Sequence, residues 1–195
     1  MRLFVALDLD DSIRDRIARF LDGVREFAPE ARWVRPESLH VTLKFIGEKS
    51  GDETGKIKRA LQTITADSFQ MNIRGYGFFP GTRAPRVFWI GVEADSKLAS
   101  LAETVDQCME ALNIPKEEHA FNPHLTLARG AAGSDARRKP KGGGQAPGLQ
   151  HLHEKLSALT APEFGTMTAR EFFLYQSQLL PGGSRYTKLA GFALH

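Results

Sequence analysis

Two short motifs with the same residue types could carry acid–base chemistry. His40-Val-Thr-Leu43 and His124-Leu-Thr-Leu127 lie 84 positions apart. Imidazole titrates near neutral pH, so one of two histidines can accept a proton while the other donates one. The hydroxyls of Thr42 and Thr126 could hydrogen-bond to oxygens that gain negative charge in a transition state. A repeated His-x-Thr motif therefore predicts cleavage of a phosphate diester, with His40 and His124 as the catalytic pair.

Strand geometry predicts which side chains accompany each histidine. In an extended strand, successive side chains point to opposite faces. The polar face of the first motif would then hold His40, Thr42 and Lys44, and its apolar face Val41, Leu43 and Phe45. In the second motif Ala128 would join the histidine face, and Arg129 would point away from it. Spacing alone leaves Arg129 open as a phosphate clamp or as a surface residue. Trp33 and Phe45 could stack on a base, but their apolar settings favour core packing.

A metal site is the main alternative for a pair of histidines. Catalytic zinc usually takes three protein ligands, and neither motif contains a cysteine or an acidic residue to supply the third. His119 has no counterpart in the other copy of the repeat. His151 and His153 are spaced i, i+2 on a predicted helix and would point apart, so we interpret them, with His195, as surface residues. The sequence therefore predicts neither a metal nor a cofactor.

The two motifs belong to a longer internal repeat. Arg2-Leu-Phe4 resembles Arg86-Val-Phe88 at the same spacing of 84, and an apolar stripe at helical spacing follows each segment. We predict an α+β chain of two similar lobes related by a pseudo-two-fold axis, forming one domain over residues 1–195. If the lobes pack about that axis, the histidine faces meet across a cleft. Strands are expected near 2–9, 39–46, 69–79, 87–93, 122–128, 169–180 and 186–194, and helices near 11–27, 53–65, 95–112 and 148–159.

Composition is that of a folded chain with a mild positive charge. The 195 residues include 42% hydrophobic and 25% charged residues, with a formal net charge of +3, which permits a polyanionic partner without requiring one. The single cysteine, Cys108, fits a reducing compartment, and the apolar start ends too early for a signal peptide or a membrane span. We therefore expect a cytoplasmic protein. Residues 130–148 form a Gly-rich insertion with basic residues at 137–141, predicted to be a mobile surface loop that could follow an RNA backbone.

The residues also resemble a known family. His40 to Gly47 and Asn122 to Arg129 resemble the two signatures of the two-histidine phosphoesterase superfamily. The segments 2–9 and 174–194 are similar to its RNA 2′,3′-cyclic phosphodiesterase branch, also called 2′-5′ RNA ligase. The resemblance implies two antiparallel sheets that form a V-shaped cleft, with helices on their outer faces. It also implies metal-independent hydrolysis of a terminal 2′,3′-cyclic phosphate on RNA, which leaves a 2′-phosphate.

The resemblance further implies a role for each site residue. His40 would be the acid that protonates the departing O3′, and His124 the base that activates water. Thr42, Thr126 and Arg129 would hold the phosphate. The partner would be an RNA end, for example a tRNA half, or a small cyclic nucleotide, bound by a monomer away from any membrane. Alternatives are 2′-5′ ligation of tRNA halves and a non-catalytic RNA-binding module, but two intact motifs favour catalysis.

Overall fold

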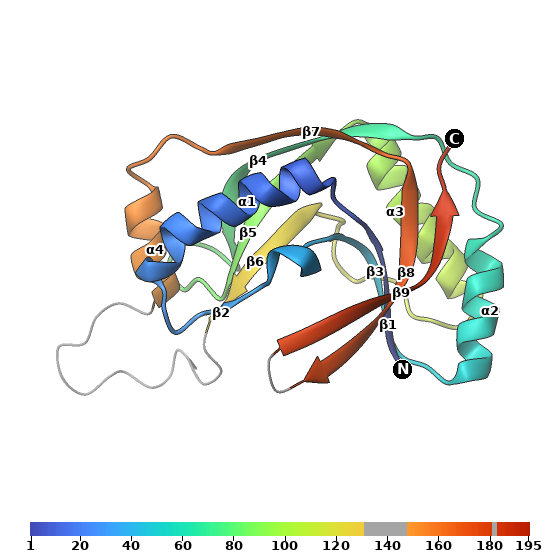
Figure 1. Cartoon of the computed structure of the whole chain (residues 1–195). Helices are drawn as coiled ribbons and strands as arrows, with labels where there is room; N and C mark the ends of the chain where they lie inside the picture. The colour runs from blue at the N-terminus through green and yellow to red at the C-terminus, as the bar shows by residue number, and fades with distance from the viewer. Residues whose placement is uncertain (131–147, 181–182) are drawn as a thin grey trace.

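The chain folds into two antiparallel sheets flanked by helices. The computed structural model describes residues 1–130, 148–180 and 183–195, so the basic residues 137–141 of the predicted loop lie outside the described residues. The first sheet has the order β3 (Val41–Glu48), β1 (Arg2–Leu7), β8 (Glu171–Leu180) and β9 (Gly183–Ala193). The second has the order β2 (Arg32–Trp33), β6 (His124–Arg129), β5 (Val87–Ala94), β4 (Phe69–Phe79) and β7 (Glu163–Ala169). Figure 1 shows the two sheets side by side, which confirms the predicted α+β class.

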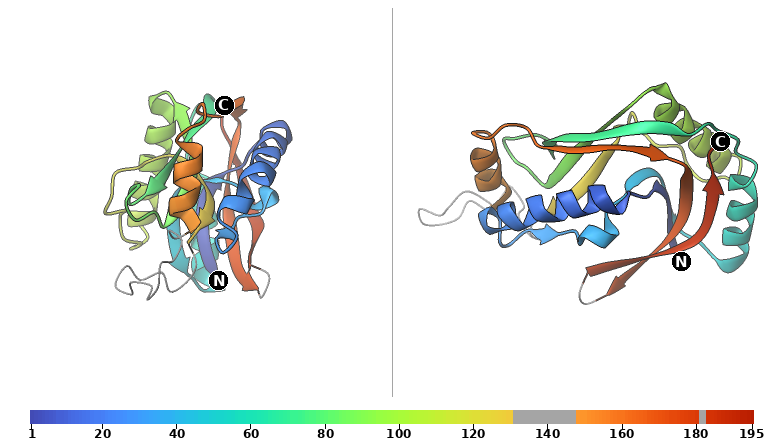
Figure 2. Two further views of the ribbon diagram at one scale, coloured as in Figure 1. Left: turned by 90° about the vertical axis from the view of Figure 1, so that its left-hand side faces the viewer. Right: turned by 45° about the horizontal axis from the view of Figure 1, so that its top comes forward.

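The two sheets have equivalent strand orders, but each contains strands from both halves of the chain. The order β3-β1-β8 in the first sheet corresponds to β6-β5-β4 in the second. Strand β4 comes from the first half yet lies in the second sheet, and β8 does the reverse. The helices cross over too: α1 (Asp11–Val24) contacts β7 of the second sheet, and α3 (Ser96–Glu110) contacts β3 of the first. Figure 2 gives two further views of the sheets and helices. The lobes are therefore interlocked rather than successive.

All four predicted helices are present, with small differences at their ends. The apolar stripe of α1 is buried at Ile13, Ile17, Leu21 and Val24, and a 3₁₀ turn over Arg25–Phe27 replaces its expected last turn. Helix α2 (Gly51–Leu61) begins with a capping box in which Ser50 and Glu53 each bond the other's backbone N–H. Helix α4 (Gly148–Leu156) buries three leucines. Within the described parts of the chain, no helix is long and apolar enough to cross a membrane.

Strands β2 and β7 were not predicted. Strand β7 reads Glu-Phe-Gly-Thr-Met-Thr-Ala, and its buried residues are Phe164, Met167 and Ala169. The spacing changes from three to two because Gly165 has a φ of +117° and the ladder to β4 shifts register there. This irregularity removes the alternation by which a half-buried strand is predicted. Strand β2 has only two residues, too few for a periodic pattern.

Both histidine strands contain a β-bulge just after the threonine. In the ladder between β1 and β3, Ala6 pairs with Thr42 and Val5 pairs with Lys44, so Leu43 has no partner. In the ladder between β5 and β6, Trp89 pairs with Thr126 and Phe88 with Ala128, so Leu127 has none. An extra residue reverses the alternation beyond it.

The same ladders show that the repeat is not continuous in register. Thr42 and Thr126 are 84 residues apart, but their partners Ala6 and Trp89 are 83 apart. The predicted equivalence of Phe4 and Phe88 is therefore wrong by one residue. Phe4 packs in a small cluster with Ala6 and Tyr175, whereas Phe88 lies in the main core.

The first bulge turns Lys44 into the interior, so its predicted place on the histidine face is wrong. Lys44 is 1% exposed, and its Nζ lies 2.5 Å from the Asp106 carboxylate on α3. Nζ also donates to the Pro115 carbonyl at 2.6 Å. Glu117 adds a longer contact of 3.7 Å. This ion pair between buried Lys44 and half-buried Asp106 fastens α3 of the second half to β3 of the first.

Breaking that pair from one side should destabilise the fold. Asp106→Ala leaves the buried ammonium without its nearest counter-charge, which should lower the free energy of unfolding by about 3 kcal/mol. Urea denaturation of the whole chain measures the loss. The matched double variant Lys44→Met/Asp106→Leu removes both charges and should stay within about 1 kcal/mol of the wild type. If the double variant loses as much as the single one, the charge is not the cause.

Candidate active site

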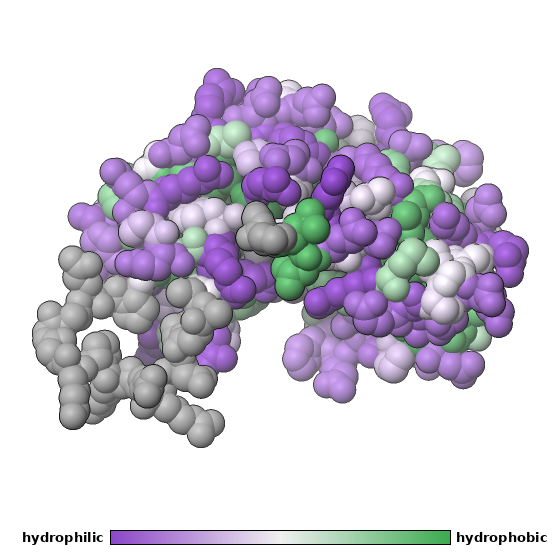
Figure 3. Space-filling view, turned by 60° about the horizontal axis from the view of Figure 1, so that its bottom comes forward, coloured by the Kyte–Doolittle hydropathy of each residue, from purple (hydrophilic) through white to green (hydrophobic). Residues whose placement is uncertain are grey.

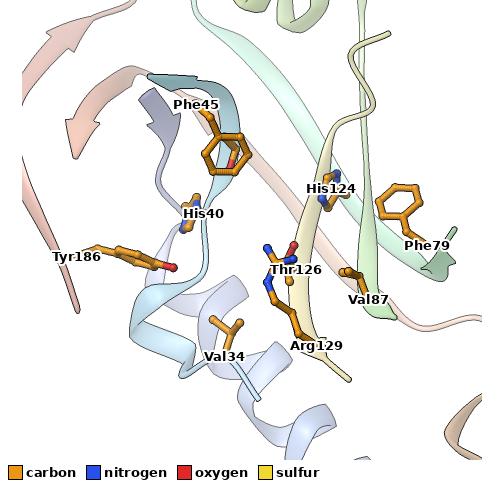
Figure 4. A pocket seen from close by; sticks show the side chains of 10 residues that line it. Val34, His40, Phe45, Phe79, Val87, His124, Thr126, Arg129 and Tyr186 are labelled. Carbon is orange, nitrogen blue, oxygen red and sulfur yellow. The ribbon is translucent and has the colours of Figure 1, made fainter. Parts of the chain in front are cut away.

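A cleft of about 260 Å³ lies between the sheets where the two histidine strands face each other. Figure 3 shows the molecule hollowed between its two lobes. The cleft is lined by His40, Thr42, His124, Thr126 and Arg129, together with Val34, Phe45, Phe79, Val87 and Tyr186. All five residues predicted for the site are therefore brought together. Figure 4 shows His40 and His124 on opposite strands, with the Arg129 side chain reaching toward the space between them.

The two bulges decide which third residue each strand contributes. Because Leu127 is the extra residue in β6, Arg129 returns to the face of His124 and Thr126. The strict alternation that aimed Arg129 away is thus corrected. Because Leu43 is the extra residue in β3, Phe45 returns to the face of His40 in the same way. Phe45 and Arg129 are themselves 84 residues apart, so they occupy equivalent positions in the two halves of the cleft.

Each histidine is held by a backbone carbonyl two residues before it. His40 Nδ1–H donates to the Ser38 carbonyl at 2.8 Å, and His124 Nδ1–H donates to the Asn122 carbonyl at 2.7 Å. A carbonyl oxygen only accepts, so the contact places a proton on Nδ1 and leaves Nε2 available to the cleft. Both rings thus have the same tautomer when neutral, and Nε2 is the nitrogen that can accept a proton in each.

Burial lowers the pKa of both histidine rings. For His40, burial lowers the pKa below its usual value, the Ser38 carbonyl and the Asp8 carboxylate oppose this, and His124 and Arg129 add to it. For His124, burial again lowers the pKa, the Asn122 carbonyl opposes it, and Arg129 adds to it. Each histidine is therefore poised to be neutral near pH 7 until negative charge enters the cleft.

Aromatic side chains enclose the rings. His40 lies 4.7 Å from Phe4 and meets Tyr186 edge-on at 5.1 Å, and His124 meets Phe79 edge-on at 5.1 Å, between ring centroids. Phe45 is 57% exposed, so the prediction that it packs in the core is wrong. That prediction holds for Trp33, which packs edge-on against Phe88 and donates from Nε1 to the Ala28 carbonyl.

Comparison with known proteins agrees with this geometry. Residues 7–89 and 90–186 each match the family described as LigT like phosphoesterase, and each stretch contains one histidine motif. The chain belongs to this family. The fold matches the crystal structure of TT0787 of Thermus thermophilus, with a TM-score of 0.77, 30% identity and coverage of 100% of this chain and 98% of the other. It also matches Escherichia coli LigT solved with 3′-AMP, with a TM-score of 0.76, 29% identity and coverage of 99% and 97%.

Curated relatives of this LigT-like chain carry a common name. The RNA 2′,3′-cyclic phosphodiesterase of Archaeoglobus fulgidus is 35% identical over 98% of this chain and 99% of the relative. The protein of that name from Methanothermobacter thermautotrophicus is 32% identical over 100% and 99%. Similarity over the full length of both chains shows that the whole two-sheet unit is shared.

The remaining histidines do not join the site of this LigT-like chain. His119, His151 and His195 are exposed, whereas His153 is partly buried against Phe78, so its prediction as a surface residue is wrong. Among residues 1–130, 148–180 and 183–195, no group of three or more His, Cys, Asp or Glu side chains is placed to hold a metal ion. Sequence reasoning gave no site role to Phe79, which ends β4 and stacks on Trp89 with ring centroids 5.0 Å apart.

The lowered pKa values predict a pH dependence of stability. A histidine whose pKa is lower in the folded state binds fewer protons folded than unfolded, so its contribution is fully present above the unfolded value of about 6.5. That contribution is lost as the pH falls from about 6.5 through the folded pKa. His40→Asn and His124→Asn should each flatten the decline in urea midpoint between about pH 7 and pH 5.5. Identical slopes in the wild type and both variants would contradict the burial-lowered pKa values.

Proposed function

We propose that this chain hydrolyses a terminal 2′,3′-cyclic phosphate on RNA to a 2′-phosphomonoester, with His40 and His124 as the acid–base pair. The observation that carries the proposal is the placement of two Nε2 atoms on opposite walls of one cleft, with a guanidinium between them. Hydrolysis of a cyclic diester needs a base on one side of the phosphorus and an acid on the other. The names of the full-length relatives give the substrate class.

The proposed reaction assigns one proton transfer to each ring. Neutral His124 takes a proton from water through Nε2 as the water oxygen forms a bond to phosphorus. The bond from phosphorus to O3′ breaks, and protonated His40 gives its proton to O3′. The cyclic phosphate opens to a 3′-hydroxyl and a 2′-phosphate. His124 then releases its proton to solvent, and His40 takes one up from solvent. Thr42, Thr126 and Arg129 donate to the non-bridging oxygens, where charge grows.

The unequal pair Phe45 and Arg129 gives the cleft a direction. Arg129 supplies a planar, permanently charged fork that suits phosphate oxygens. Phe45 supplies an exposed ring beside His40, on which a base can stack with about 1–3 kcal/mol of affinity. We therefore place the nucleoside on the side of Phe45 and the phosphate between the histidines. The solved complex of Escherichia coli LigT with 3′-AMP supports a nucleotide ligand.

Further parts of the proposal concern the setting of the enzyme. We infer that it works as a monomer on RNA ends such as those of tRNA halves. Cytoplasmic location is proposed because the single cysteine fits a reducing compartment. A role in 2′-5′ ligation uses the same two proton transfers with the 5′-hydroxyl of a second RNA in place of water: His124 takes the hydroxyl proton as the 5′ oxygen bonds to the phosphorus of the cyclic phosphate, and His40 protonates the departing O3′.

Product analysis on a defined oligonucleotide tests the proposal. A short RNA ending in a 2′,3′-cyclic phosphate should be converted to the 2′-phosphate, which alkaline phosphatase then removes. Dialysis against EDTA should leave the rate unchanged, and zinc or manganese should not raise it. A 3′-phosphate product would contradict the assigned leaving group. Binding of the oligonucleotide without turnover would favour an RNA-binding module, and joined products from two RNA fragments would favour ligation.

Replacement of the histidines should separate their roles. His40→Ala and His124→Ala should each lower kcat on the cyclic phosphate by about a hundredfold or more, the usual contribution of one proton transfer. A nitrophenyl phosphodiester has a leaving group that needs no proton, so it should lose much less rate in His40→Ala than the RNA substrate does. His124→Ala should lose similar rate on both substrates. Single-turnover rates on the two substrates measure the difference.

The exposed His119 provides a matched control for these variants. His119→Ala removes an imidazole outside the cleft and should leave both rates at the wild-type value. If His124→Ala is the variant rescued by the nitrophenyl leaving group, the two roles are reversed. Full activity in either histidine variant would exclude the acid–base pair.

A further inference from the structure

The pseudo-two-fold symmetry of the cleft presents a chemical difficulty. The two histidines share the same motif, tautomer and carbonyl contact, yet hydrolysis needs one protonated and one neutral ring at the start. Some neighbour that is not duplicated must therefore distinguish them. The candidate is the residue opposite each histidine, which lies just beyond the end of β1 in the first sheet and within β5 in the second.

The residues opposite the two histidines differ in charge. In the second sheet, Gly91 on β5 pairs with His124. In the first sheet, the last pair of the ladder is Leu7 with Val41, and the next step places Asp8 opposite His40. Asp8 and Gly91 are 83 residues apart, the same spacing as Ala6 and Trp89, which pair with the two threonines. An acid thus faces one histidine where a glycine faces the other.

The glycine position has no room for a matching acid. A Cβ added at Gly91 would lie 2.7 Å from the backbone oxygen of Arg74 on β4, a contact that a side chain cannot make without moving the strand. The close approach of β4 therefore keeps the position beside His124 free of any side chain. The asymmetry is built into the backbone of the second sheet as well as into the side chain of the first.

Asp8 is fixed in place by three donors. Its Oδ1 accepts from the Leu9 N–H at 2.8 Å and from Arg14 Nη2 at 2.5 Å, and its Oδ2 lies 2.5 Å from Lys188 Nζ. Burial alone would raise the pKa of Asp8, but the bonds from Lys188 and Leu9 and the charges of Lys188 and Arg14 lower it below its usual value. Asp8 is therefore ionised throughout the neutral range.

Arg14 connects Asp8 to the turn that orients His40. While Nη2 binds Asp8, Nη1 donates to the Pro36 carbonyl at 2.5 Å and to the Leu39 carbonyl at 3.4 Å. The 3₁₀ turn Pro36–Ser38 ends in the carbonyl that accepts from His40 Nδ1. The anion that faces the ring and the turn that aims it are thus held by one guanidinium. Arg14 therefore fixes both the negative charge near His40 and the turn that orients the His40 ring.

We propose that Asp8, held by Arg14 and Lys188, is the positioning residue that makes His40 rather than His124 the acid of the pair. The inference rests on the proposed function, because that reaction defines which histidine is the acid. The effect of Asp8 on the protonation of His40 is a property of the protein alone. His40 is the more buried of the two rings, so its protonated form has the greater need of a nearby negative charge.

The other charged and titratable groups around His40 act in known directions. Arg129 and His124 face it from β6 and disfavour its protonated form. Lys188 on β9 and Arg14 on α1 partly offset the charge of Asp8. Tyr175 on β8 stays neutral near pH 7 because burial, and then the Asp8 charge, raise its pKa. Tyr186 on β9 meets the ring edge-on. Asp8 is thus the carboxylate on this wall whose charge favours a protonated His40.

Titration of the histidine ring signals by NMR tests the inference without substrate. Asp8→Asn keeps the shape of the side chain and removes its charge, so the pKa of His40 should fall by at least about 0.5 unit while that of His124 stays in place. Lys188→Met frees Asp8 from a cation and should move His40 in the opposite direction. Asp67→Asn, the same change in an exposed ion pair with Lys97 outside the cleft, should move neither ring.

The pH profile of kcat/KM on the cyclic phosphate gives the second readout. The limb at high pH reports loss of the proton on the acid, so Asp8→Asn should shift that limb downward by the same amount. The rate near pH 8 should then fall about threefold or more, and the nitrophenyl substrate should show much less of this loss. If Asp8→Asn fails to fold, Lys188→Met provides the same test, with the high-pH limb expected to move in the opposite direction. The limb at low pH, which reports His124, should stay in place.

The two readouts separate failure of the inference from failure of the proposed function. An unmoved His40 signal in both variants, or equal movement of His40 and His124, would overturn the role of Asp8 whatever the substrate is. A shift of the low-pH limb in Asp8→Asn would overturn it as well. If His40 moves as expected but the cyclic phosphate is not hydrolysed by the wild type, the electrostatic inference holds and the proposed function is wrong.

Discussion

The cleft depends on the extra residue that directly follows the threonine in each histidine strand. Without the bulge at Leu127, Arg129 would lie on the outer face of its sheet, and without the bulge at Leu43, Lys44 would enter the cleft in place of Phe45. The bulges also send Lys44 toward α3, where its ion pair with Asp106 joins the two halves of the chain. A local irregularity of the backbone therefore selects the cleft residues and supports the interface behind them.

The internal repeat makes the two halves of the cleft alike, whereas the proposed reaction requires its two histidines to differ. The like parts are the histidines, the threonines and the carbonyls that hold the rings. The unlike parts occupy equivalent positions: Phe45 against Arg129, and Asp8 against Gly91. In the proposed function the first pair distinguishes the ends of a nucleotide, and in the role proposed for Asp8 the second pair distinguishes the protonation states of the two histidine rings. One asymmetric substrate thus fits one orientation in a cleft whose framework is nearly symmetric.

The sequence predicted those features of the fold and the site that appear as a regular spacing of residues along the chain. Helical stripes located all four helices, and the repeated His-x-Thr motif brought out His40, Thr42, His124 and Thr126, because each signal depends on residues close together in the chain. The faces of Lys44, Phe45 and Arg129 depend on the bulges, which follow from the pairing of two strands and leave no mark within one. Strand β7 escaped notice because Gly165 breaks its alternation, and the offset of 83 between β1 and β5 appears only when their partners are aligned.

Interlocking explains how a cleft between two lobes can hold catalytic geometry. Acid–base catalysis loses much of its effect when the groups move by about 1 Å, so two lobes joined by a flexible connection would be unsuitable. Here β4 of the first half lies in the second sheet, β8 of the second half lies in the first, and α1 and α3 cross in the same way. Movement of one wall relative to the other would therefore disturb the contacts of α1 with β7 and of α3 with β3, and the one large buried cluster that contains residues of both sheets. The core shared by the two sheets thus holds His40 and His124 on facing walls, and the binding of substrate can change protonation in the cleft without first assembling it.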